Sequence, residues 1–210
     1  MLGEPKHEGK DEENLTHFFR HYRISFVDST PLRVCKNQRI HIHKVFKGIA
    51  QRGKCSMGWF FGFKLHLICN EKGELLNFML TPGDVDGRKP LEHKAFIDFI
   101  YGKLFGDKGY ISKNLFQRLF VDGIRLITKL KSNMKGAIMS VSDRLLLRKR
   151  AIIETVNDEL KNIAQVEHSR HRCFDSFIVN LLGAIAAYCL FPKKPCINPQ
   201  RTIDTQLALF

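Results

Sequence analysis

The sequence predicts an α/β domain in which helices cover a mixed β-sheet. Aromatic and β-branched runs with strand-like patterning fill much of the first half of the chain, and short strands then alternate with segments of helical apolar spacing. Strands that alternate with helices after an initial meander are typical of layered α/β domains. A chain of 210 residues can bury a substantial core, and its length favours one domain.

The first half of the chain predicts three strands and one long loop. Residues 22–28 alternate as a half-buried strand does, and the Ser-Thr-Pro that follows is expected to end the strand. Basic residues and glycines predict a loop over residues 33–58. Residues 59–69 and 74–80 are strand-like and flank a Gly-containing turn, so they predict a β-hairpin.

The second half of the chain alternates helices with strands. Helical spacing is seen over residues 90–101, 112–120, 142–164 and 174–191, and strand-like runs over residues 103–107 and 123–128. The expected order is β-β-β-α-β-α-β-α with a final apolar helix. That helix contains Asp175, Ser176 and Asn180 and falls short of the ~20 apolar residues of a membrane span, so we expect a buried helix.

The composition predicts a basic protein that binds nucleic acid. An excess of 34 Lys and Arg over 21 Asp and Glu gives a formal net charge of +13, which attracts polyanions. Six cysteines without a CxxC pair, and a start without an apolar signal region, indicate reduced thiols in the cytosol and no secretion. We expect residues 1–17 to form a charged tail or linker, 18–191 the folded domain and 192–210 a C-terminal tail.

Three carboxylates stand where they can share one metal site. Asp28 and Asp107 end two strand-like runs, and Glu154 lies in a polar stripe of the helix pattern with Arg150 and Lys161. Carboxylate oxygens are the ligands that hard cations such as Mg²⁺ prefer. The alternatives are that the two aspartates are turn or cap residues and that the stripe is the solvated face of an amphipathic helix.

At these residues the chain resembles the DDE transposases of bacterial insertion sequences. The resemblance covers roughly residues 18–191 and points most closely to insertion sequence family 982. It is carried by Val27-Asp28-Ser29, by Gly106-Asp107-Lys108-Gly109-Tyr110, by Arg150-x3-Glu154-x6-Lys161, and by the run from Gly58 to Leu67 with Thr81-Pro82-Gly83. It implies an RNase H-like fold, a mixed sheet flanked by helices.

The resemblance also implies a function and a catalytic mechanism. Asp28 would bridge two Mg²⁺ or Mn²⁺ ions, with Asp107 and Glu154 each holding one, for cleavage of transposon ends and strand transfer. Arg150, Lys161 and Lys108 would contact DNA phosphates. The partner is double-stranded DNA of the transposon ends and the target, in the bacterial cytoplasm at the nucleoid, and a homodimer around paired ends is left open.

Relatives of this type carry a further N-terminal segment that is implicated in recognising transposon ends. Fewer than thirty residues precede Asp28 here, so a truncated copy or a catalytic-domain fragment is expected. Two other functions stay open: an RNase H-like nuclease without strand transfer, and an inactive DNA-binding transposase remnant.

The basic segment of residues 33–58 predicts a second contact with nucleic acid. It includes Arg39 and Lys44 and interleaves its cations with apolar and aromatic residues. The alternative is a solvated basic loop. Two groups have the residue types of a zinc site, namely Cys35 with His41 and His43, and His168 and His171 with Cys173; both are disfavoured because neither has a second ligand pair. Asp84 and Asp86 could also belong to the carboxylate set, but we expect them to be turn residues that cap the next helix.

Overall fold

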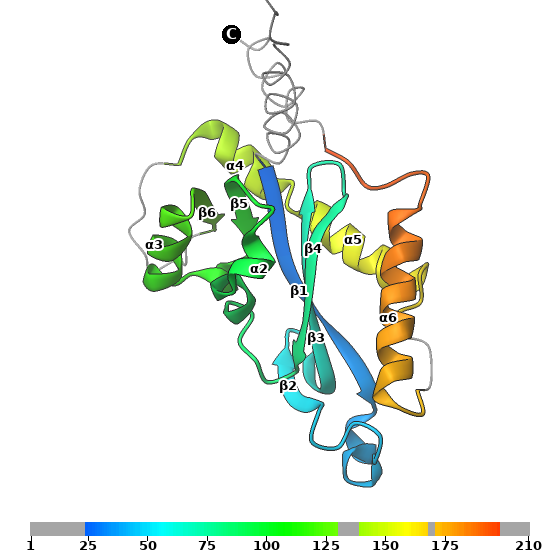
Figure 1. Ribbon diagram of the computed structural model, residues 1–210. Helices are drawn as coiled ribbons and strands as arrows, with labels where there is room; N and C mark the ends of the chain where they lie inside the picture. Colours follow the sequence, from blue (N-terminus) through cyan, green and yellow to red (C-terminus); the bar gives the residue numbers. More distant parts are fainter. Residues whose placement is uncertain (1–23, 130–138, 168–170, 198–210) are drawn as a thin grey trace, which may run out of the picture.

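The computed structural model describes residues 24–129, 139–167 and 171–197, which form a six-stranded mixed sheet with helices on both faces (Figure 1). The strands are β1 (Ile24–Cys35), β2 (Gln51–Cys55), β3 (Gly58–Asn70), β4 (Leu75–Pro82), β5 (Gly102–Gly106) and β6 (Ile124–Thr128). Their order is β2-β3-β1-β5-β6, with β4 also paired to β3. The pairs made by β3 are antiparallel, whereas β1–β5 and β5–β6 are parallel. The predicted mixed sheet is confirmed.

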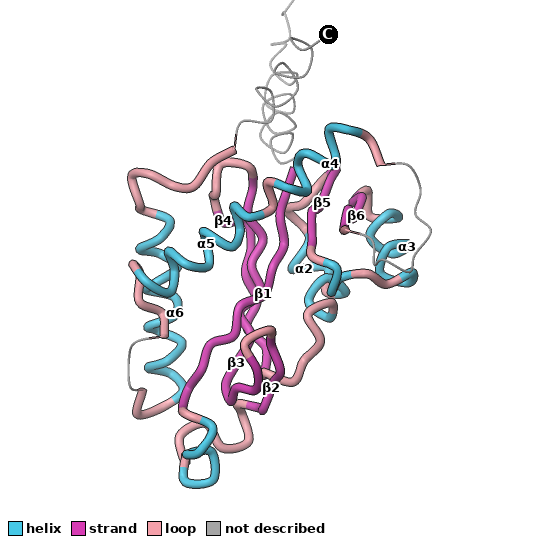
Figure 2. The backbone as a smooth tube through the Cα atoms, turned by 180° about the vertical axis from the view of Figure 1, so that it is seen from behind, coloured by secondary structure: helices cyan, strands magenta, loops and turns pink. Residues whose placement is uncertain are grey.

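The helices lie in two groups, one on each face of the sheet (Figures 1 and 2). Helices α2 and α3 belong to one group, and α5 and α6 to the other. The helical elements are η1 (Asn37–Ile42), η2 (Lys89–Glu92), α2 (Lys94–Ile97), η3 (Lys108–Tyr110), α3 (Lys113–Val121), α4 (Val141–Arg148), α5 (Ala151–Asn162) and α6 (Phe174–Cys189), where η marks a 3₁₀ helix. No described helix is long and apolar enough for a membrane crossing.

Two apolar clusters pack these layers together because neighbouring strand residues point to opposite faces of the sheet. Phe26 of β1 belongs to the cluster beneath α5 and α6, whereas the next residue, Val27, belongs to the cluster beneath α2 and α3. Leu67 and Ile68 of β3 divide between the clusters in the same way. All four residues are almost fully buried. The central strands are therefore covered on both faces, which fixes their register.

Strand β1 is longer than the sequence predicted. The Ser-Thr-Pro after Asp28 does not end it, since β1 continues to Cys35 and pairs with β3 along that stretch. Beyond Phe26 the strand has a partner on one side only, because the pairing with β5 stops there. A strand with one free side tolerates a proline such as Pro31, which has no N–H to donate.

The predicted long loop over residues 33–58 was wrong in part. It contains the end of β1, the 3₁₀ helix η1 and the edge strand β2, which pairs with the start of β3. The hairpin of β3 and β4 and the strands β5 and β6 match their predictions closely. Helix α3 also lies as predicted, and Ser112 caps it by accepting a hydrogen bond from Leu115 N.

Two of the predicted helices are each broken into two pieces. Residues 90–101 contain η2 and α2, separated by an extended His93. The long helix predicted over residues 142–164 ends at Arg148, and α5 starts afresh at Ala151. In one straight helix, six positions at about 100° each would set Ile152 and Ile153 roughly 240° round from Leu146 and Leu147. The break allows both pairs to be buried.

The last predicted helix is confirmed as α6. The expected tail at residues 1–17 lies outside the described residues, as do His168 and residues 198–210 of the predicted C-terminal tail.

Candidate active site

The candidate site lies where β1 and β5 part. The two parallel strands pair at three positions, ending with Phe26 opposite Phe105. Asp28 follows two residues later in β1, and Asp107 comes directly after the end of β5. The carboxyl ends of parallel strands form an edge at which ligands commonly bind in α/β sheets. Both predicted aspartates stand at this edge.

Helix α5 brings the third carboxylate to the same place. Ile153 and Val156 are fully buried against the sheet, which turns Glu154 and Asn157 toward the strand ends. Asn157 Nδ2 donates a hydrogen bond of 3.1 Å to Asp28 Oδ2 and so ties α5 to β1. The sequence alternative, in which the polar stripe is only a solvated face, does not describe Asn157, whose exposure is 6%.

Asp28, Asp107 and Glu154 all line one open pocket of about 650 Å³. The turn between β2 and β3, at Ser56 and Met57, forms another part of its wall. The pocket also receives lysines from three elements, namely Lys54, Lys64 and Lys161. Carboxylates and cations therefore meet in one solvent-accessible space, which is an arrangement that can hold a metal ion and a phosphate together.

Arg150 links two of the three carboxylates. Its Nη2 lies 2.7 Å from Glu154 Oε1 and 3.8 Å from Asp107 Oδ1, and its side chain is 17% exposed. The residue sits at the N-cap position of α5, directly after the break from α4. The break between α4 and α5 therefore also places the Arg150 guanidinium beside Glu154 and Asp107.

Burial raises the pKa of Asp28 to about 6. The charges of Glu154 and Asp107 push in the same direction, whereas the Ser29 N–H and Arg150 oppose them. A carboxylate that is buried beside other carboxylates is costly to ionise. A divalent cation at this point would relieve that cost.

The oxygen donors of the site fit Mg²⁺ or Mn²⁺. They comprise the three carboxylates and Asn157 Oδ1, which is buried and accepts no hydrogen bond in the described part of the chain. Within the described residues, no three His, Cys, Asp or Glu side chains form a preassembled metal cluster. The carboxylates share a pocket but are held apart, with Arg150 contacting two of them.

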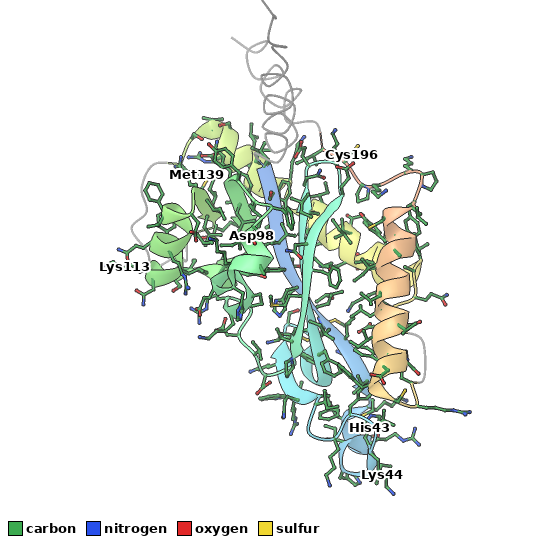
Figure 3. The ribbon with its side chains drawn as sticks, in the orientation of Figure 1. His43, Lys44, Asp98, Lys113, Met139 and Cys196 are labelled. Atoms are coloured by element: carbon green, nitrogen blue, oxygen red, sulfur yellow. The ribbon has the colours of Figure 1, made fainter. Side chains whose placement is uncertain are left out.

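The predicted DNA-contacting residues fall into two groups. Lys161 lines the pocket, where its Nζ donates to Pro31 O at 2.8 Å and lies 3.5 Å from Glu167 Oε2. Lys108 is exposed at the rim, next to Asp107. Arg39 and Lys44 do not line this pocket; they lie in and after η1, and Figure 3 places Lys44 beyond the far end of β1.

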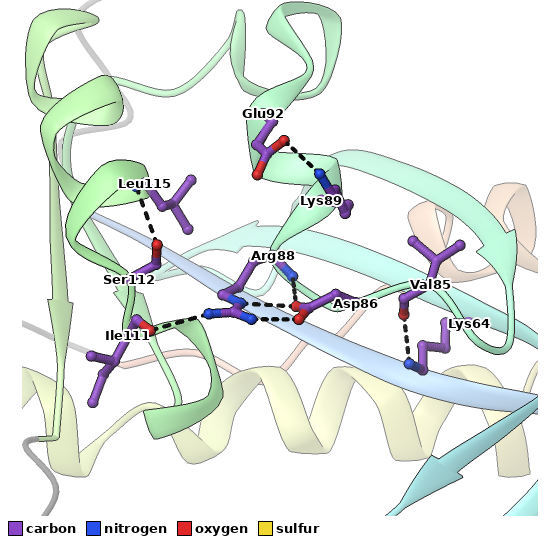
Figure 4. Close-up of polar contacts among 9 residues, drawn as sticks. All are labelled: Lys64, Val85, Asp86, Arg88, Lys89, Glu92, Ile111, Ser112 and Leu115. Atoms are coloured by element: carbon purple, nitrogen blue, oxygen red, sulfur yellow. Dashed lines mark hydrogen bonds and ion pairs between the residues drawn. The ribbon is translucent and has the colours of Figure 1, made fainter.

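Asp86 also lines the pocket, although sequence reasoning placed it only in a turn. Its turn role is present, since its Oδ1 accepts from the Arg88 N–H at 2.9 Å, but η2 has no side-chain cap (Figure 4). The Arg88 guanidinium also donates to both carboxylate oxygens and lowers the pKa of Asp86 to about 2. Asp86 therefore stays ionised, and Arg88 already balances its charge.

Lys64 and the turn between β2 and β3 were missed as parts of the site. Lys64 Nζ donates to Val85 O at 2.6 Å (Figure 4). No local pattern marks Lys64, because it stands with His66 in an otherwise apolar run of β3. The turn lies inside the segment that was predicted as a loop.

A family model described as a transposase DDE domain matches residues 19–174. The chain belongs to this family. Among solved structures, the domain is similar to the piggyBac transposase in a synaptic complex with hairpin DNA, with 11% identity and a TM-score of 0.53 over 80% of this chain. The domain spans 46% of that transposase chain. A likeness at this level shows the fold, which is RNase H-like.

A second solved structure, the catalytic core domain of BIV integrase, is similar to the transposase domain at 11% identity. The alignment has a TM-score of 0.45 and covers 89% of this chain and 97% of the integrase chain. No curated protein sequence matches the domain.

Proposed function

We propose that this domain catalyses DNA transposition in the manner of insertion sequence family 982, by cutting the ends of a transposon and joining them to target DNA. The observation that carries the proposal is the meeting of Asp28, Asp107 and Glu154 in one pocket where β1 and β5 part and α5 crosses them. The match to the DDE transposase family supports it. We propose that it acts in the bacterial cytoplasm, on double-stranded DNA at the nucleoid.

Asp28, Asp107 and Glu154 are the residues that would hold two divalent ions. Such ions, when bound, supply an activated water or 3′-hydroxyl and stabilise the leaving oxygen in phosphodiester chemistry. Asn157 orients Asp28 through its 3.1 Å hydrogen bond. Lys161 is held at the pocket wall by Pro31 O, where its ammonium can contact a phosphate beside the scissile bond.

The test is metal-dependent nicking of duplex DNA by the full chain. Asp28→Asn, Asp107→Asn and Glu154→Gln should each abolish nicking in Mg²⁺ or Mn²⁺. They should also reduce the rise in melting temperature that Mn²⁺ produces, which reports metal binding without catalysis. Asp122→Asn, an exposed aspartate after α3, is the matched control and should change neither readout. Full nicking by folded Asp28→Asn would remove Asp28 from the site.

Strand transfer separates the transposase from a nuclease of the same fold. A labelled 3′ end should become joined to a target plasmid in the presence of metal. Nicking without joined products would favour the RNase H-like nuclease. Failure of the folded chain both to nick and to show carboxylate-dependent stabilisation by metal would favour a DNA-binding remnant.

A further inference from the structure

A second basic region lies along the later part of β1, next to the catalytic pocket. Two adjoining pockets of about 490 and 300 Å³ have Arg33, Val34, Cys35 and Lys36 in common among their lining residues. We call these two pockets together the β1 groove. The larger extends to η1 and α6, and the smaller ends on Trp59 of β3.

The rim of the β1 groove is cationic. Arg33, Lys36 and Arg39 are exposed along it, so it attracts phosphates. Glu167 is the one carboxylate among the described residues that line the groove, and its charge is already engaged. Its Oε1 accepts from Arg33 N at 3.1 Å, and its Oε2 lies 3.5 Å from Lys161 Nζ.

The floor of the larger pocket is apolar and aromatic. Leu32, Phe46, Val166 and Phe177 line it and are buried. The His43 ring lies against Phe46 with ring centroids 5.5 Å apart, and its Nε2 has no hydrogen-bond partner in the described residues. The apolar floor fits a flat base and the cationic rim fits a phosphate, and a nucleotide has both. The pocket volume lies in the range of small-molecule sites.

Trp59 supplies a stacking surface at the other end of the groove. Its side chain is half exposed, with Arg52 Cζ 5.0 Å and Lys54 Nζ 5.8 Å from the ring centroid. Asn37 Nδ2 donates to Trp59 O at 2.8 Å, which anchors this end to η1. Exposed aromatic rings flanked by cations are how single-stranded nucleic acid is held without sequence preference.

We propose that the β1 groove binds unpaired, single-stranded DNA, with one nucleotide in the larger pocket and a neighbouring base against Trp59. A duplex keeps its base faces stacked inside the helix, whereas the half-exposed Trp59 ring and the exposed Ile42 of the larger pocket offer apolar surface that only an unstacked base can use. The inference rests on the proposed function, because the strand would come from the catalytic pocket. The ion pair between Lys161 and Glu167 joins the wall of that pocket to the wall of the groove. A strand that leaves the catalytic pocket past Lys161 therefore enters the groove.

The chain contains a single tryptophan, so its intrinsic fluorescence reports on Trp59 directly. A mixed-sequence single-stranded oligonucleotide, in EDTA, should quench this fluorescence and bind more tightly than a duplex of equal length. Deoxyadenosine monophosphate alone tests whether an isolated nucleotide suffices. Weak quenching by the mononucleotide and strong quenching by the strand are expected, since the strand adds phosphate contacts. Stronger binding of the mononucleotide would overturn the assignment to DNA.

Variants locate the binding by anisotropy of a labelled single strand. Trp59→Ala should weaken binding by about 5- to 150-fold, the range for loss of one stacked base. Arg39→Ala should lower the slope of log affinity against log salt by about 0.7. Lys113→Ala, an exposed lysine of α3 outside both pockets, is the control and should change neither. Unchanged binding by Trp59→Ala and Arg39→Ala would overturn the proposal.

The groove and the catalytic site can fail separately. Asp28→Asn should still show quenching of Trp59 by the single strand, because Asp28 lines neither pocket of the groove and the measurement needs no metal. In the unaltered chain, quenching by the single strand without any metal-dependent nicking would contradict the proposed function and support the groove as a single-strand site. Metal-dependent nicking without a preference for single-stranded over duplex DNA would overturn the groove and leave the proposed function standing.

Discussion

At the scale of single residues, Arg150 is the most consequential side chain beyond the carboxylates. It contacts both Glu154 and Asp107 and lowers the cost of placing two negative charges beside the buried Asp28. A guanidinium in this position performs the charge compensation that a divalent cation would also provide. Arg150 and a bound metal ion would therefore stabilise the same carboxylates.

Arg150→Ala should make the folded chain more responsive to metal. The variant loses its built-in cation, so its melting temperature should fall without metal and should rise more than that of the unaltered chain when Mn²⁺ is added. Differential scanning fluorimetry measures both effects. Arg144→Ala, on the exposed side of α4, is the control. Equal rises in the unaltered chain and Arg150→Ala would show that Arg150 does not compensate the carboxylates.

His66 gives a pH-dependent contribution to stability. It is fully buried in β3, with Nε2 2.8 Å from Thr81 Oγ1, and burial lowers its pKa to about 4. The unfolded chain binds a proton near pH 6.5, so stability is present above that value and is lost as pH falls toward 4. The full loss corresponds to about 3 kcal/mol.

His66→Gln should flatten this dependence. Urea denaturation at pH 7 and pH 5 gives the free energy of unfolding of each chain, and the unaltered chain should lose about 2 kcal/mol more than the variant between these values. Asp28, whose raised pKa gives the opposite slope, is present in both chains and cancels. The same pH dependence in both chains would contradict the buried, neutral state of His66.

At the scale of elements, the sequence patterns predicted those features that are determined by neighbouring residues in the chain, such as strand ends and helix faces. Strand ends at Asp28 and Asp107 were recognisable from apolar runs followed by polar residues, and Glu154 from the spacing of its helix. The hydrogen bond between Asn157 and Asp28 and the contact of Arg150 with Asp107 join residues far apart in the chain. No periodicity encodes such contacts. The assignment of Asp28, Asp107 and Glu154 to one catalytic site came from the resemblance to DDE transposases.

The elements that were missed have weak local signals. Strand β2 is short, polar and glycine-containing, and it exists because β3 offers it a partner. The break between α4 and α5 has neither glycine nor proline, so it is set by burial of apolar pairs on both sides. Strand β2 brings Lys54 to the pocket, and the break places Arg150 beside Asp107 and Glu154, so the least predictable parts of the fold position residues of the site.

The docking of β2 depends on the absence of a side chain at Gly53. A Cβ there would overlap the Gly83 carbonyl that follows β4. Gly53→Ala should lower the free energy of unfolding by about 1–3 kcal/mol and disturb the turn that lines the catalytic pocket. Gly183→Ala, in the middle of α6 with open space around it, should raise stability by about 0.5–1 kcal/mol. Urea denaturation of both variants checks this contrast, which a neutral Gly53→Ala would contradict.

At the scale of the whole molecule, an acidic centre sits in a strongly basic protein. The formal net charge of +13 favours any polyanion, whereas the carboxylates of the pocket, Asp28, Asp107 and Glu154 among them, repel a phosphate until cations compensate them. Lysines in the pocket wall partly offset that repulsion locally. Affinity for DNA should therefore come mainly from phosphate contacts made by particular cations, such as Lys161 at the pocket wall, and catalysis from the carboxylates.

Salt dependence of duplex binding tests this division of roles. The logarithm of affinity should fall linearly with the logarithm of salt, each phosphate contact contributing about 0.9 to the slope. Lys161→Ala should lower the slope by about 0.9, because Lys161 lines the pocket and is held there by Pro31 O. Lys113→Ala removes an equal charge outside the pocket and should leave the slope unchanged. If the two variants lower the slope equally, binding follows overall charge, and Lys161 has no distinct place on the DNA.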